Sequence, residues 1–209
     1  MNLKESLIWD AHAGLFPSSE MDLDNLLSWQ KYNVNYLSIN VGFDVMSRDA
    51  TLATLAAYRR WLMARPDQFL LVGTLSDIYN ARDTCRLAIS FDIEGMNALG
   101  GDINMVEIYH TLGVRQMLFA YNLNNSAAGG CHDIDIPLTK FGVEILAEMN
   151  RVGIIVDASH VGYLSSMELI ERSSSPVIFS HSNPWSIWQH QRNITDEQIK
   201  ACAAKGGVI

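Results

Sequence analysis

The sequence predicts an α/β protein built on a parallel sheet, of the (β/α)8-barrel type. Short runs rich in apolar and β-branched residues alternate with segments of helical period along the 209 residues. This alternation predicts parallel strands joined by right-handed crossovers. Most strand runs are apolar at both parities, as expected for strands covered on both faces. An open doubly wound sheet also fits the order, but no GxGxxG or Walker A motif follows a strand, which weakens a nucleotide-binding version.

The expected elements follow one another along the whole chain. The strand-like runs are 7–12, 36–42, 69–74, 87–94, 114–121, 154–160, 177–181 and 207–209. The helical patterns lie near 20–33, 48–65, 77–84, 104–112, 138–152, 165–174 and 195–205. The helix that ends at Val152 is followed by Gly153, a common helix stop. The last helix begins with Thr195 and carries Gln198 three residues on, which predicts a capping box.

One segment, 122–137, is too long for an ordinary connection and has no periodic pattern. Such a segment in a compact domain is typical of a functional loop or a lid. No repeat, low-complexity stretch or Pro/Ser-rich linker divides the chain. We therefore expect residues 1–209 to form a single domain.

The composition excludes several classes of protein. The formal net charge is −8, which argues against a nucleic-acid partner or an anionic membrane surface, because both bind basic proteins. No apolar run approaches the ~20 residues that span a bilayer, and the first residues do not form a signal peptide. The three cysteines Cys85, Cys131 and Cys202 are widely spaced, which favours free thiols in a reducing compartment. We expect a soluble, cytoplasmic protein.

Residues that bind metals well recur at one topological position. His12, Glu94 and His160 each end a strand run, and His181 follows the run 177–180. The carboxyl ends of parallel strands lie at one rim of a barrel, where catalytic groups converge. Neighbouring strands lie about 4.8 Å apart, so two imidazoles can share an ion about 2.0–2.1 Å from each nitrogen. These residues therefore predict a metal centre.

The remaining histidines do not share that position. A single histidine at a strand end is more often a hydrogen-bonded structural residue, so the prediction rests on the joint pattern. His110 lies in a predicted helix and His190 in a polar loop, and we interpret both as surface residues. His132 lies in an acidic turn, and its neighbour Cys131 is a weak signal for a ligand pair.

Five collinear motifs resemble one known family. They are FDIEGMNAL (91–99), LGVRQML (112–118), LTKFGVEILAEMNRVGIIVDASH (138–160), SHSN (180–183) and RNITDEQIKACAAKGGVI (192–209). From about residue 7 onward the chain resembles the membrane (renal) dipeptidase family, zinc-dependent barrel hydrolases of the wider amidohydrolase-like group. It looks most similar to bacterial members.

The resemblance implies a role for each matching residue. Glu94 resembles the carboxylate that bridges two zinc ions, and His160 and His181 resemble the imidazoles that complete one of the two sites. His12 resembles the histidine of a first-strand His-x-Asp pair. Arg192 resembles the arginine that holds the terminal carboxylate of a dipeptide, a task that suits the planar guanidinium fork.

The chain departs from the family at other site positions. Gly14 stands where the His-x-Asp pair has its aspartate, so of one or two possible zinc ions we expect one, at Glu94, His160 and His181. Asp10 points to the same strand face as His12 and is a possible substitute ligand. Tyr121, followed by Asn122, stands where the family often has a histidine near the substrate, and both are candidate substrate-binding residues.

The resemblance also implies that the barrel is incomplete. Family barrels continue to an eighth strand with an aspartate at the metal centre, whereas this chain ends at Ile209. We expect the last one to two βα units to be missing and the chain to be a fragment of a longer enzyme. The run 69–74 then becomes an accessory strand, since Glu94 falls on the third barrel strand. Unpaired edges of such a barrel favour association into a homo-oligomer.

The implied function is zinc-dependent hydrolysis of a dipeptide or a similar small amide. Glu94 would hold the metal and orient the attacking water. Two alternatives stay open, because fold alone does not determine the substrate. One is a metallohydrolase for another amide or a lactone. The other is a non-catalytic barrel remnant that binds a metal or a small ligand.

Overall fold

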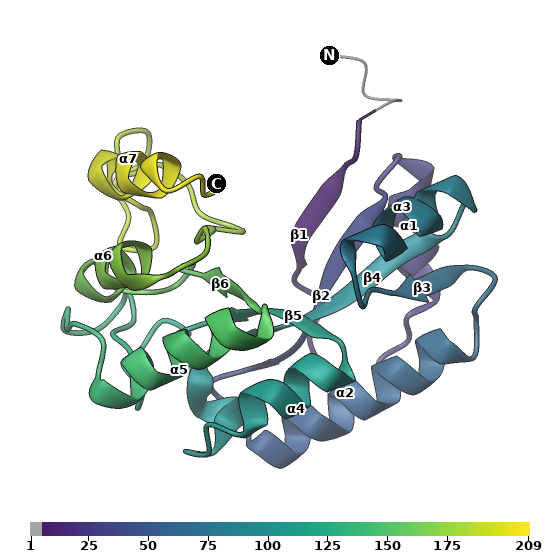
Figure 1. Cartoon of the computed structure of the whole chain (residues 1–209), viewed down its shortest axis with the longest axis horizontal. Coiled ribbons are helices and arrows are strands. Elements are labelled where there is room, and N and C mark those ends of the chain that lie inside the picture. The colour runs from purple at the N-terminus through teal and green to yellow at the C-terminus, as the bar shows by residue number, and fades with distance from the viewer. Residues whose placement is uncertain (1–5) are drawn as a thin grey trace.

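A computed structural model describes residues 6–209, which form a curved parallel sheet with helices along its outer face (Figure 1). The strands are β1 (Trp9–Ala13), β2 (Tyr36–Phe43), β3 (Phe69–Leu71), β4 (Leu87–Glu94), β5 (Val114–Leu118) and β6 (Ile155–Asp157). The sheet has the order β1-β2-β4-β5-β6, and each pairing is parallel. This is the wall of an incomplete (β/α) barrel, so the predicted fold class is confirmed.

The helices that connect these strands start and stop where the caps of the sequence place them. They are α1 (Leu27–Lys31), α2 (Arg48–Met63), α3 (Leu75–Asp83), α4 (Met105–Leu112), α5 (Lys140–Val152), α6 (Tyr163–Arg172) and α7 (Asp196–Ala204), with 3-10 turns η1 (Asp24–Leu26) and η2 (Met96–Leu99). Gly153 ends α5 in the left-handed conformation, and Thr195 and Gln198 form the predicted capping box of α7. The expected helix over 20–33 is shorter: η1 and α1 together cover only 24–31, and Asn33 has φ 64°.

Strand β3 lies off the path of the barrel, as the sequence predicts. It pairs with Leu87–Ile89 in the first half of β4, whereas β5 pairs with the second half, from Phe91 to Glu94. Both partners therefore lie along the same side of β4, one behind the other. Glu94 consequently lies on the third strand of the barrel wall.

The two faces of the sheet differ in polarity. Alternate residues of β2 and β4 such as Ile39, Val41 and Phe91 are fully buried and belong to the apolar core under the helices. The other parity carries buried polar side chains, including Asn40, Asp92 and Glu94, on the inner face. An inner face lined with buried polar groups needs hydrogen-bond partners, and it forms the floor of the site described below.

The predicted strands 177–181 and 207–209 are wrong as strands. Only single parallel bridges, Asp157 with Ile178 and Ile178 with Val208, continue the sheet there. The physical reason is the length of β6, whose three residues offer too few backbone groups for a longer ladder.

The predicted strand 154–160 also ends early, at Asp157. The Asp157 side chain accepts a hydrogen bond from the Ser159 N–H at 2.9 Å, and the His160 backbone adopts the left-handed conformation, with φ 65°. When a side chain accepts a hydrogen bond from the backbone two residues later, the chain forms a turn in place of the next hydrogen bond between strands. His160 and His181 therefore lie on loops after the strands rather than at strand ends.

Within residues 6–209 every helix is too short or too polar to cross a bilayer. All three cysteines are free thiols, as predicted; Cys85 is exposed and Cys202 is buried.

We expect the buried Tyr109 on α4 to make the stability of the protein depend on pH at high pH. Its hydroxyl is buried and donates to the Ala98 carbonyl at 2.9 Å, and burial raises the pKa of Tyr109 to about 12. An unfolded tyrosine ionises near pH 10, so the stabilisation is complete below pH 10 and is lost as the pH rises toward 12. Melting temperatures of wild type and Tyr109→Phe between pH 9 and 11.5 are expected to converge as the pH rises. The exposed Tyr32 supplies a control, because Tyr32→Phe should follow wild type throughout. A difference in melting temperature between wild type and Tyr109→Phe that stays constant over this pH range would contradict the prediction.

Candidate metal centre

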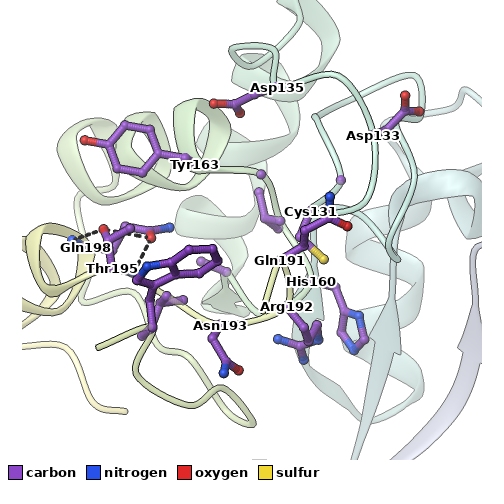
Figure 2. Close-up of a pocket in the computed structure, with 16 residues that line it drawn as sticks. Cys131, Asp133, Asp135, His160, Tyr163, Gln191, Arg192, Asn193, Thr195 and Gln198 are labelled. Carbon is purple, nitrogen blue, oxygen red and sulfur yellow. Dashed lines mark hydrogen bonds between the residues drawn. The ribbon is translucent and has the colours of Figure 1, made fainter. Parts of the chain in front are cut away.

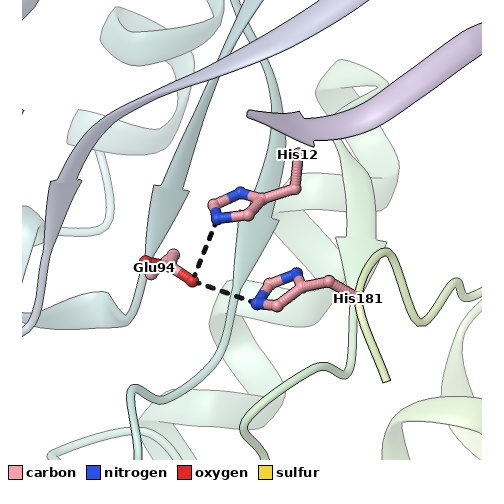
Figure 3. Close-up of side chains that lie close together, drawn as sticks. All are labelled: His12, Glu94 and His181. Carbon is pink, nitrogen blue, oxygen red and sulfur yellow. Dashed lines mark ion pairs between the residues drawn. The ribbon is translucent and has the colours of Figure 1, made fainter. Parts of the chain in front are cut away.

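Glu94, the last residue of β4, lies at the centre of a group of histidines. Its Oε1 lies 3.6 Å from His12 Nε2, 3.4 Å from His160 Nε2 and 3.4 Å from His181 Nε2. Figure 3 shows His12 and His181 pointing at this oxygen from two sides. The rings of His12 and His181 stack with centroids 4.2 Å apart. One carboxylate oxygen thus faces three imidazole nitrogens.

The topology of the sheet brings these residues together. His12 comes from β1, His160 from the loop after β6, and His181 from the loop after the bridge at Ile178. Because the strands are parallel, their carboxyl ends meet at one rim. The structure places all four residues predicted as ligands at this rim, within contact of Glu94.

The donor atoms of His12, Glu94 and His181 fit a single metal ion, because they all lie within 4.8 Å of one another. Ligand atoms about 2.0–2.1 Å from a tetrahedral ion lie about 3.3–3.4 Å from one another. The distances from Glu94 to the histidines match that separation, and His160 Nε2 and His181 Nε2 are slightly closer, at 2.9 Å. Three imidazoles and a carboxylate are also the donor types that zinc takes in proteins.

The opposite ring nitrogen of His12 is held by a carboxylate. His12 Nδ1 lies 3.0 Å from Asp92 Oδ1, and Asp92 is fully buried. The same oxygen accepts a hydrogen bond from Asn40 Nδ2 at 3.0 Å. A carboxylate accepts the Nδ1 proton, so in the neutral form of His12 the lone pair is on Nε2, which faces Glu94.

The other two histidines are held in the same sense. His160 Nδ1 lies 2.8 Å from Asn122 Oδ1, and His181 Nδ1 lies 2.7 Å from Ser180 Oγ. The amide oxygen of Asn122 can only accept, so the proton of His160 is on Nδ1. In each histidine an oxygen binds Nδ1 and leaves Nε2 for the shared point. Asn122, predicted as a substrate-binding residue, therefore contacts His160 directly.

The charges around the site act differently on two of the histidines. Burial disfavours the charged form of His12, but Asp92, Glu94 and Asp157 outweigh it and raise the pKa of His12 to about 9. Burial, together with the positive charge of Arg192 and the neighbouring histidines, lowers the pKa of His160 to about 2. His160 is therefore a neutral donor, and the acidic groups near His12 favour a cation at this end of the site.

Two hollows meet at His160. The first, of about 210 Å³, is lined by polar groups that include Arg192 and Cys131 (Figure 2). The second, of about 440 Å³, has the metal-binding candidates at its base and Phe16, Phe43 and Tyr121 among its walls. A small molecule bound at the centre can thus extend into a polar side and an aromatic side.

Arg192 lies in the loop before α7 and is half-buried. It donates from Nη1 to Ser182 Oγ at 3.0 Å and from Nη2 to the His181 carbonyl at 2.8 Å. Burial lowers the pKa of Arg192. The guanidinium therefore braces the loop that carries His181 while its remaining N–H groups stay available.

Tyr121 lies in the wall of the second hollow. Its ring centroid lies 4.7 Å from that of His160 and 5.2 Å from that of Phe43. Its backbone N–H donates to Asp44 Oδ2 at 3.1 Å. These contacts fix the ring beside the candidate metal ligands.

Asp10 is not a substitute ligand, and that part of the sequence interpretation is wrong. Its Oδ2 accepts a hydrogen bond from Trp29 Nε1 at 2.8 Å, which turns the carboxylate toward α1. The strand is irregular between Asp10 and Ala13, so period-two alternation does not carry Asp10 to the face of His12. At Gly14 an added Cβ would meet only the His12 ring, at 3.6 Å.

The sequence interpretation missed several residues that support the site. Asp92 stands two residues before Glu94 on β4, so strand alternation could have found it. Asp44 gave no such signal. Its carboxylate accepts from the backbone of Asn97 and Tyr121 and from Asn125, and burial raises the pKa of Asp44. It joins the loops that follow β2, β4 and β5.

Comparisons with known proteins identify relatives of this chain. An uncharacterized dipeptidase of Schizosaccharomyces pombe is 29% identical over an alignment of 183 residues, which covers 85% of this chain and 44% of that protein. The crystal structure of an amidohydrolase from Pseudomonas aeruginosa matches with a TM-score of 0.90 and 30% identity, over 99% of this chain and 62% of that chain. A metallopeptidase from Rhodobacter sphaeroides, bound to a phosphinate mimic of the dipeptide L-Ala-D-Ala, shares the fold at 17% identity, with a TM-score of 0.83 over 97% of this chain and 72% of that one.

The chain spans less than half the length of the curated relatives it matches. The sequence pattern of one family nevertheless covers residues 2–209. The fold, the rim of histidines around Glu94 and this match lead to one conclusion: the chain belongs to the membrane dipeptidase family, peptidase family M19.

Proposed function

We propose that this protein is a zinc-dependent hydrolase of dipeptides or similar small amides. The observation that carries the proposal is the orientation of the three imidazoles. Each has its Nδ1 bonded to an oxygen, of Asp92, Asn122 or Ser180, and its Nε2 turned to Glu94 Oε1. Such an arrangement is typical of metal-binding histidines.

His12, Glu94, His160 and His181 are the residues that would hold the metal. A catalytic zinc takes three protein ligands and keeps its fourth position for water or substrate, so three of the four would bind the ion at one time. When bound, zinc supplies Lewis acidity that polarises an amide carbonyl and makes water nucleophilic at neutral pH. Because Gly14 offers no carboxylate, we expect one ion per chain. The free thiols support the expectation of a reducing, cytoplasmic location.

Three residues would act on the substrate. Glu94 would orient the attacking water with its carboxylate, which is nearly buried at 7% exposure. Tyr121 would donate a hydrogen bond from its hydroxyl to the oxygen on which charge develops. Asn122 would keep His160 in place beside the scissile amide.

A dipeptide would lie across His160, with one end in each hollow. The guanidinium of Arg192 has five N–H donors, and two of its nitrogens already donate to Ser182 and His181. The remaining donors would bind the terminal carboxylate in the polar hollow. The residue at the amino end would then lie against Phe16 and Phe43.

The role of Arg192 predicts that the enzyme needs a free carboxylate on its substrate. Two charge-assisted hydrogen bonds are worth about 3 kcal/mol, so amidation of the dipeptide should lower kcat/KM about 100-fold. Arg192→Met should lower kcat/KM by a similar factor for the free acid and much less for the amide. Zinc content must be equal in both proteins, because Arg192 also braces His181. Equal cleavage of acid and amide by wild type would contradict this role.

Measuring bound zinc and substrate turnover on the same protein separates dipeptide hydrolysis from two other functions: metal binding without catalysis, and hydrolysis of another amide or a lactone. The absence of a carboxylate at Gly14 favours a barrel that binds metal without catalysis. Bound zinc without turnover of dipeptides, other small amides or lactones would support that binding role. Turnover of lactones or other amides but not dipeptides would support a different metallohydrolase.

A further inference from the structure

Asp157 is the last residue of β6, and both oxygens of its carboxylate accept hydrogen bonds from protein groups. Oδ1 accepts hydrogen bonds from the backbone N–H of Ser159 at 2.9 Å and of Ser180 at 3.2 Å. Oδ2 accepts from Gln116 Nε2 at 2.8 Å and from the hydroxyl of Ser180. The side chain is fully buried. Asp157 therefore binds four donors.

Two of these donors stand directly before the histidines of the centre. Ser159 precedes His160, and Ser180 precedes His181. One carboxylate oxygen thus fixes the backbone at the start of both loops. The loops are also joined to each other, since the His181 N–H donates to Ser159 Oγ at 3.2 Å.

The hydroxyl of Ser180 passes the effect of Asp157 on to the imidazole of His181. Ser180 Oγ has a single proton, which it donates to Asp157 Oδ2 because an ionised carboxylate only accepts. Toward His181 Nδ1, 2.7 Å away, the same oxygen must then act as acceptor. Nδ1 of His181 therefore carries a proton, so Nε2, which faces Glu94, is the nitrogen left to bind a metal.

We propose that Asp157 is a positioning residue of the metal centre, which sets the tautomer of His181 through Ser180 and holds the loops of His160 and His181 in register. This inference rests on the proposed metal centre. Asp157 is not itself a ligand, because both of its oxygens are engaged by protein donors.

The substitution Asp157→Asn separates this role from a purely structural one. The asparagine keeps an oxygen for the Ser159 and Ser180 N–H groups but places an NH2 group where Oδ2 was. That group donates to Ser180 Oγ, so the hydroxyl proton turns to His181 Nδ1 and moves the imidazole proton to Nε2. Gln116 Nε2 donates both to Asp157 Oδ2 and to the Ala11 carbonyl. In the variant it loses the first acceptor and keeps the second, so the fold is expected to persist.

The test measures zinc affinity and histidine tautomers in the same chain. Chelator competition should show about 10–100-fold weaker zinc binding in Asp157→Asn. Nitrogen-15 NMR of the metal-free protein should show a proton on His181 Nδ1 in wild type and none on that nitrogen in the variant. Asp92→Asn is the matched control: it removes a buried carboxylate that contacts His12, and it should leave the tautomer of His181 unchanged.

A second variant keeps the inference testable if Asp157→Asn fails to fold. Ser180→Ala retains Asp157 but removes the connecting hydroxyl, and it should weaken zinc binding as well. With Ser180 absent, adding Asp157→Asn should cost less affinity than it does in wild type, because contacting residues do not act additively. Unchanged affinity and an unchanged His181 tautomer in a folded Asp157→Asn protein, or unchanged affinity in Ser180→Ala, would overturn the inference. If wild type itself binds no zinc, the proposed function fails instead.

Discussion

Glu94→Gln is expected to lower the affinity for zinc about 1000-fold. Glu94 Oε1 is the one atom that faces all three histidines. Zinc bound by four ligands contributes about 10–16 kcal/mol, so one ligand accounts for about 3–4 kcal/mol, or about three powers of ten. Glutamine keeps the shape of the side chain and removes its charge. Zinc per chain and competition with a chromophoric chelator measure the loss.

The exposed Glu144 on α5 provides the matched control for this substitution. Glu144→Gln removes the same charge from the chain and should leave zinc affinity unchanged. Alanine at His160 or His181 should lower the affinity as Glu94→Gln does. If Glu94→Gln bound zinc as tightly as wild type, the ion would bind elsewhere and the proposed centre would be wrong.

Gly95→Ala should destabilise the protein by about 2–5 kcal/mol, the sum of backbone strain and overpacking. Gly95 has φ 107° and ψ 159°, a region open only to glycine. An added Cβ would lie 2.1 Å from the Asp44 carboxylate. That carboxylate is held by the Asn97 and Tyr121 N–H groups, so it cannot move aside freely. Urea unfolding measures the loss of stability, and zinc affinity should fall with it, because Glu94 is the neighbouring residue.

The substitution Gly101→Ala distinguishes backbone strain from overpacking against Asp44. It also has a positive φ, 78°, but an added Cβ there has no atom within 4 Å. Gly101→Ala should therefore cost only backbone strain, about 1 kcal/mol. Similar losses for both variants would show that the contact with Asp44 does not matter.

Much of the fold could be predicted because its signals are local. The helix over Lys140–Val152 and the capping box of Thr195 and Gln198 depend on neighbours within a turn or two. The accessory strand 69–74 was predicted from the family resemblance instead, because the match places Glu94 on the third barrel strand. The expected strand at 177–181 failed for a non-local reason: its length is limited by its partner, β6.

The candidate site divides in the same way. His12, Glu94, His160 and His181 were found because parallel strands bring their carboxyl ends to one rim. The direction of Asp10 was not predictable, since it depends on Trp29 and on an irregular register in β1. Contacts of this kind join residues that are far apart in the chain, so the periodicity of the sequence cannot predict them.

The sequence by itself determined the parallel α/β architecture, the family and which side chains could bind a metal, because period, capping and strand order are properties of the chain. Only the tertiary structure decided how those side chains are held. The carboxylates of Asp92 and Asp157 and the amide of Asn122 contact the site from other strands and loops. Hydrogen bonds across such distances depend on the packed positions of whole elements, so they exist only once the chain has folded.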